Sequence, residues 1–175
     1  MAVLAVATGV YFATRPGEEP PPEPDPIIRL WKFEMEELKH ILIELPRLDM
    51  SESFIKHEDQ QWYFDDVSGL QVNPDRWGGG IPLILAGPAT ERPIFEDATE
   101  EQLAIYGFIP PLMKMTLTTE DEEVTNIEVG DANPNGTAYY IRLAESNNVY
   151  TINDAWYKVL ERLVLDPPYP SEEEE

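Results

Sequence analysis

The chain has 175 residues, enough for one domain of ordinary size with a real hydrophobic core. Its formal charge of −22 repels phosphate backbones and anionic lipid surfaces, which argues against nucleic-acid binding and against a domain lying flat on a membrane. It has no cysteine, so disulfides, thiol catalysis and cysteine-bound metal clusters are excluded. The acidity indicates either a solubilising surface or a partner protein with a basic surface.

The first fourteen residues, MAVLAVATGVYFAT, carry no charged side chain. As a helix they would be about 21 Å long, short of the roughly 30 Å hydrocarbon core. We interpret residues 1–14 as a membrane anchor, part of a transmembrane helix completed upstream or by tilt, with Tyr11, Phe12 and Arg15 as its interfacial flank. A cleaved signal peptide and a soluble segment are the alternatives, although the basic residues that precede a signal's apolar region are missing.

Residues 15–26 are rich in proline and glutamate. Prolines at this density favour an extended left-handed helix without backbone hydrogen bonds, rising about 3.1 Å per residue. We predict a stalk over 15–26, with a proline-rich ligand for an SH3-like module as the alternative. An α+β domain is expected over 27–171, followed by an acidic tail, 172–175.

In the first half of this domain, short apolar runs are separated by polar turns. The patterns predict strands over 27–33 and 40–45, and a hairpin of 51–57 with 61–66. Asn73 and Pro74 predict the start of a helix, which the glycines at 78–80 and Pro82 interrupt before an apolar segment. Thr99 is expected to cap a helix over 100–106 that ends at Gly107.

The second half predicts four antiparallel strands, over 112–119, 124–130, 137–143 and 148–152. An amphipathic helix follows over 154–165, capped by Asn153, with Trp156, Leu160 and Leu163 among the residues of its apolar face. The two halves end alike, in a strand, a tryptophan, an apolar segment and a proline. The fold predicted is therefore α+β, mainly antiparallel β-sheet in two β-rich units, each closed by a helix or apolar segment and preceded by the transmembrane helix.

The order of these motifs resembles a known family. An N-terminal anchor, a tryptophan-bearing strand (WYFDD), the turn YGFIPPLMKMTL, the hairpin IEVGDANPNGTAYYIRL, NVYTI and a closing helix before DPP are similar to the bacterial domain-of-unknown-function family numbered 4340. The resemblance covers about 27–168 and the anchor. It brings no catalytic residues, and it implies an extracytoplasmic accessory role at membrane complexes, some of them transport complexes of the gliding-motility type.

The segment DANPNG matches the first half of a calcium loop through Asp131, Asn133, Asn135 and Gly136. The position that should carry the bidentate glutamate is Arg142, so we interpret the segment as a hairpin tip rather than a metal site. Asn135 to Thr137 also form a glycosylation sequon.

The remaining candidates have no catalytic spacing. His40 and His57, the only histidines, lie on predicted strands without a metal-binding pattern. Ser51 and Ser53 lack the glycine elbow that presents a nucleophile. The glycine triplet at 78–80 lacks the lysine and hydroxyl of a phosphate-binding loop. No catalytic, cofactor-binding or metal-binding residue is therefore assigned, and no cofactor is expected.

Two classes of function follow. The first is a noncatalytic, single-pass membrane protein whose acidic domain, on the extracytoplasmic side, binds a partner protein or stabilises a transporter-like membrane complex. The second is an extracytoplasmic ligand-binding protein or enzyme that uses a pocket between the two β-rich units. The missing nucleophile, base and metal set favours the first class, and the protein is not expected to be an enzyme.

Overall fold

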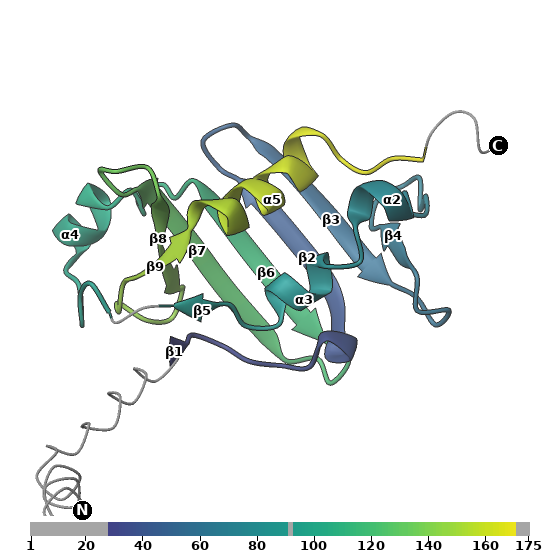
Figure 1. Ribbon diagram of the computed structural model, residues 1–175, viewed down its shortest axis with the longest axis horizontal. Helices are drawn as coiled ribbons and strands as arrows, with labels where there is room; N and C mark the ends of the chain where they lie inside the picture. The colour runs from purple at the N-terminus through teal and green to yellow at the C-terminus, as the bar shows by residue number, and fades with distance from the viewer. Residues whose placement is uncertain (1–27, 91–92, 171–175) are drawn as a thin grey trace, which may run out of the picture.

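The computed structural model describes residues 28–90 and 93–170 (Figure 1). The predicted anchor, 1–14, the stalk, 15–26, and the acidic tail, 172–175, lie outside the described residues. Among the helices described, none is long and apolar enough to cross a membrane.

The described residues form nine strands, with helices between some of them and after the last. In chain order the elements are β1 (Ile28–Arg29), the 3-10 helix η1 (Met35–Glu37), β2 (Leu38–Leu45), β3 (Met50–Lys56), β4 (Trp62–Phe64), α2 (Pro74–Trp77), α3 (Ile81–Leu85), β5 (Ala89–Thr90), α4 (Glu100–Ile105), β6 (Met113–Thr119), β7 (Val124–Ala132), β8 (Ala138–Leu143), β9 (Tyr150–Asn153) and α5 (Asp154–Leu165).

Seven strands form one antiparallel sheet in the order β4-β3-β2-β6-β7-β8-β9, and β1 pairs with β5 in a separate two-stranded sheet (Figure 1). The prediction of a mainly antiparallel α+β fold is confirmed. The prediction of two β-rich units is wrong, because β2 from the first half pairs directly with β6 from the second. Ile41 and Leu117 face each other in this pairing, and both are buried in one common core. Joining the halves buries apolar surface that two separate sheets would each have to cover.

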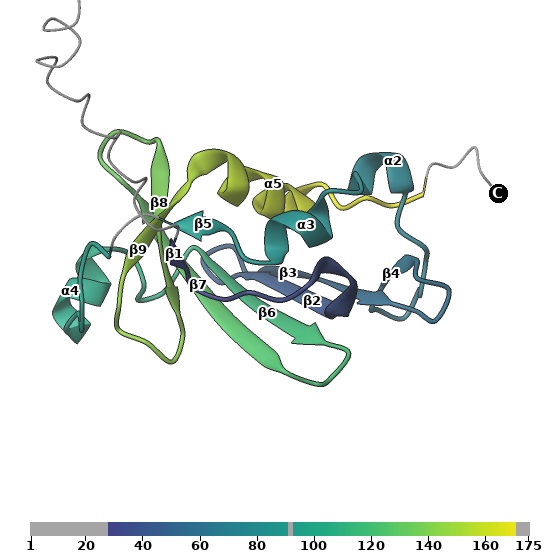
Figure 2. The same cartoon turned by 60° about the horizontal axis from the view of Figure 1, so that its bottom comes forward.

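Helices α2, α3 and α5 lie on one face of the sheet (Figure 2). Helix α5 contacts β2, β3, β8 and β9, so it spans both halves of the chain. Trp156, predicted on its apolar face, is buried, and its indole Nε1–H donates to the backbone oxygen of Ile84 over 2.9 Å. Its ring also lies 6.4 Å from that of Trp31. The aromatic side chain therefore joins α5 to α3 and to the chain that precedes η1.

The local signals for helix starts are confirmed. The Asn73 side chain accepts from the first amides of α2, where Pro74 is the first residue, and Thr99 and Asn153 cap α4 and α5 in the same way. The strand predicted over 27–33 is shorter than expected, because only Ile28 and Arg29 find a partner strand. The apolar segment after the glycines forms the short helix α3.

The opposite face of the sheet is covered at one end only. There Phe108 and Leu103, from α4 and the loop after it, form a second small core with Val149, and the ring of Tyr106 packs edge-on against Tyr140 of β8. In the part of the chain that the structure describes, nothing covers the rest of this face, over β4, β3, β2, β6 and the start of β7 (Figure 2).

We call this surface the open face. The register of the strands arranges its outward side chains in three cross-strand rows. The first row is Tyr63, Ile55, His40, Thr118 and Val124, the second is Ser53, Leu42, Thr116 and Asn126, and the third is Ser51, Glu44, Lys114 and Glu128.

Candidate functional site

Three acidic turns meet at one end of the sheet, and we call this region the acidic end. It consists of η1 with the residue before it, the β3–β4 turn and the β6–β7 turn. The backbone amide of Glu120 donates to the oxygen of Glu37 over 2.7 Å, which holds the first and third of these segments together. The carboxylates gathered here are Glu34, Glu36, Glu37, Glu58, Asp59, Glu120, Asp121, Glu122 and Glu123.

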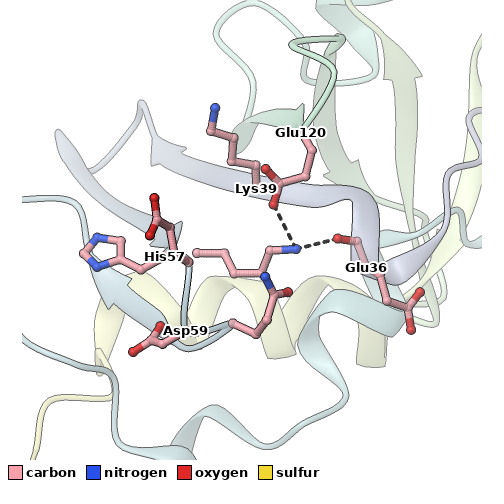
Figure 3. A pocket seen from close by; sticks show the side chains of 8 residues that line it. Glu36, Lys39, His57, Asp59 and Glu120 are labelled. Atoms are coloured by element: carbon pink, nitrogen blue, oxygen red, sulfur yellow. Dashed lines mark hydrogen bonds and ion pairs between the residues drawn. The ribbon is translucent and has the colours of Figure 1, made fainter.

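A cleft of about 900 Å³ lies between the three turns (Figure 3). Its lining includes Glu36 from η1, His57 and Asp59 from the β3–β4 turn, and Glu120 from the β6–β7 turn. His57 and Asp59 lie across the cleft from Glu36, so the two walls come from segments distant in sequence (Figure 3). The His57 ring stacks on Tyr63 with 4.2 Å between the ring centres. The cleft is therefore wide, polar and acidic, with one aromatic wall.

A buried lysine neutralises part of this charge. Lys56 follows Phe54 by two residues on β3, so strand alternation turns its side chain toward the core, and only 6% of that side chain is exposed. Its ammonium donates to the backbone oxygen of Glu36 and pairs with the Glu120 carboxylate at 3.2 Å (Figure 3). Removing one of these partners would leave the buried ammonium less compensated and would cost stability. Lys56 thus fixes the position of both walls.

The other contacts of the acidic end leave most of its carboxylates without a cation. Lys39 donates to Glu122 over 2.7 Å, and this hydrogen bond raises the pKa of Lys39 and lowers that of Glu122. The Tyr63 hydroxyl donates to Asp59 over 2.7 Å and, with the Gln61 amide, lowers the pKa of that carboxyl. Two of the nine carboxylates are therefore paired with lysine in the described structure, and Asp59 is held in its charged form.

The acidic end concentrates negative charge that is suited to attracting cations. Its lysine ammonium groups are held by carboxylates, and its histidine is stacked on a ring. Among the described residues, no three histidine, aspartate or glutamate side chains are arranged to hold a metal ion. The charges are spread over three turns and form an extended negative surface.

The DANPNG segment forms the tip of the β7–β8 hairpin, as predicted. The Asn133 amide donates to the oxygen of Ala138, the Asn133 side chain accepts from Thr137, and Gly136 has the positive φ of 69° that such a turn requires. Asp131 pairs with Arg47 at 2.7 Å, and Arg142 pairs with Glu128 on the neighbouring strand. Asp131 and Asn133, two of the side chains that suggested a calcium loop, therefore contact separate protein partners.

The structure brings together a serine, a histidine and an aspartate that are apart in sequence. On the open face, His40 Nε2 lies 2.9 Å from Ser53 Oγ and 3.0 Å from Asp65 Oδ2. In a hydrolase triad the serine and the carboxylate contact different ring nitrogens, because one nitrogen must accept the serine proton while the other donates. A single nitrogen cannot do both, so this group holds neighbouring strands together without activating Ser53.

The other predicted candidates lie apart from one another. Ser51 is exposed opposite Glu44 at the far end of β3, and His57 lies on the cleft wall. The glycine triplet joins α2 to α3, where Gly78 has a positive φ of 60° and Gly80 precedes the short helix.

Two important residues were missed in the sequence, Lys56 and Arg47. A basic residue on the apolar side of a strand was a signal for Lys56, but nothing in the turn around Arg47 indicated its role. Its guanidinium donates to Asp131 and to the backbone oxygens of Gly107 and Pro110. Position 107 must be glycine, because the Cβ of any other residue at this position would lie 2.3 Å from Asp131 Cγ.

The family described as "Domain of unknown function (DUF4340)" has a model that matches residues 85–164. This confirms the family resemblance drawn from the sequence, over a shorter range than the expected 27–168. The match runs from the last turn of α3 through β5, α4 and the strands β6 to β9 into α5. The chain has no match among curated proteins or solved structures.

Proposed function

We propose that this chain, in which residues 85–164 carry the DUF4340 domain, is a noncatalytic accessory protein whose acidic end binds a basic surface of a partner protein. Residues 1–14 anchor it in the membrane in a single pass, and the stalk, 15–26, carries the domain away from the bilayer on the extracytoplasmic side. The partner belongs to a membrane protein complex. The family resemblance implies that this complex is transporter-like.

The observation that carries this proposal is the convergence of nine carboxylates from three separate turns on one end of the sheet. Placing like charges together costs stability through mutual repulsion, and the fold offsets little of it, since two lysines pair with two of the nine. Carboxylates held on short turns and tied by backbone hydrogen bonds are positioned before a partner arrives. Such a surface speeds and orients association with a positive partner.

The test is a purification of the full-length chain from its host in mild detergent, followed by identification of co-purifying proteins. The acidic-end variant is Glu58→Gln, Asp121→Asn and Glu123→Gln, three turn residues that leave both lysine pairs intact. Its matched control removes three exposed carboxylates elsewhere, by Asp49→Asn, Glu96→Gln and Glu101→Gln. We expect a membrane-complex protein with a basic surface that is lost in the acidic-end variant and at high salt, but kept in the control. Equal recovery with both variants would refute the proposal.

A further inference from the structure

Several polar side chains in the first two rows of the open face already have partners. His40 contacts both Ser53 and Asp65, the Thr116 hydroxyl donates to Asn126, and the Asn126 amide donates to Glu145. Because these groups already have protein partners, covering them with another surface costs less than covering free polar groups. The remaining surface of the first two rows is apolar, from Leu42, Ile55 and Val124, with the threonine methyl groups and the Tyr63 ring.

The first row of the open face borders the acidic end directly. Val124, 56% exposed, follows Glu123 in the chain, and Tyr63 at the other end of the row donates to Asp59. This row crosses five strands, carries the apolar groups of Tyr63, Ile55 and Val124, and is edged by the β3–β4 and β6–β7 turns with their carboxylates. At about 4.8 Å between strands the row is roughly 19 Å long, which equals the length of about thirteen helical residues.

We propose that the open face, together with the acidic end, is the docking site for a basic amphipathic helix of the partner protein. The inference rests on the proposed function and specifies its surface and partner. The apolar side of the helix covers the row from Tyr63 to Val124, and its lysine or arginine side chains reach the acidic turns. The other face of the same sheet already accepts a twelve-residue helix, α5, in this manner.

Charge selects this occupant over others of similar shape. The carboxylates of the turns would repel an acidic helix or a nucleic acid. An added strand is disfavoured because the edge strand β4 is bridged at Tyr63 by Gln71, and the residue before β9, Val149, is bridged by Phe95. A helix laid across the face needs neither edge.

The experiment measures binding of a fluorescent fourteen-residue peptide of leucine and lysine, patterned as an amphipathic helix, to the full-length chain by anisotropy at low salt. The same pattern built from leucine and glutamate is the peptide control. The face variant is Ile55→Thr with Val124→Thr, which keeps β-branched side chains on the strands. Its matched control is Leu83→Thr with Leu165→Thr, two exposed leucines on the helix-covered side. Because Ile55 is half-buried, Val124→Lys at the exposed end of the row is a second face variant.

We expect the lysine peptide to bind and the glutamate peptide not to bind. The face variants and the acidic-end variant should each weaken binding about tenfold, while both matched controls bind as the wild type does. Weakening by the acidic-end variant alone overturns the docking site and leaves the proposed function standing. Weakening by the face variants alone overturns the basic character of the partner. No binding, or equal binding by all variants, overturns both.

Discussion

Trp156 offers the sharpest test of how the helices and the sheet hold together. Trp156→Ala removes a side chain that is 5% exposed, contacts Trp31 and donates to the Ile84 oxygen. Large-to-small substitutions of buried tryptophan cost about 3–5 kcal/mol, and the hydrogen bond contributes about 1 kcal/mol of this. For a domain of this size each kcal/mol lowers Tm by roughly 3 °C, so we expect a loss of about 12 °C.

The assays are thermal unfolding for Tm and urea unfolding for the free energy, both on the full-length chain and followed by far-UV circular dichroism, which does not depend on the tryptophan that is removed. Trp156→Phe is the matched variant, because it keeps an aromatic ring and loses the N–H donor. It should cost about 1–2 kcal/mol, less than the alanine variant. A cost below about 1 kcal/mol for Trp156→Ala would show that α5 is not held by this residue and would refute the reasoning.

Three further outcomes are expected. Arg47→Lys keeps the charge but loses the planar fork that contacts Asp131 and two backbone oxygens, so it should lower the urea midpoint about as much as Arg47→Ala; full stability of the lysine variant would contradict this. Burial, with Asp66 nearby, raises the pKa of Glu52, so its ionised form costs stability as pH rises through that pKa. Glu52→Gln should therefore stabilise the protein at pH 7 and have little effect near pH 3, and urea unfolding giving the opposite order would exclude burial as the cause. Millimolar calcium should leave Tm unchanged, whereas a real site at 100-fold excess over its Kd would add about 2.7 kcal/mol.

The features predicted well from the sequence depend on neighbouring residues. Asn73 before Pro74, Thr99 three residues before Gln102, and Asn133 to Gly136 each determine a cap or a turn within a few positions. Strand alternation also placed most of the antiparallel strands. These signals act locally, so they could be read without knowing the rest of the fold.

The features that were missed depend on pairs far apart in the chain. The pairing of β2 with β6 depends on the match of two apolar faces. The residues near Ile41 and those near Leu117 contain no signal that these two positions pair. Arg47 reaches residues 60 to 84 positions away. The candidate site was missed for the same reason, since its acidic residues seemed dispersed until the topology brought three turns to one end of the sheet.

The β2–β6 pairing determines which segment of the chain can fold on its own. The segment that matches the family, 85–164, contains β6 to β9 and nearly all of α5, but β2, one of the two strands that pair with β6, lies outside it. Excised at those bounds, β6 would present a bare edge of N–H and C=O groups beside apolar side chains, a template for aggregation. Residues 38–45 supply the strand that closes this edge. We therefore expect the smallest piece that folds without aggregating to begin before β2, well upstream of the matched segment.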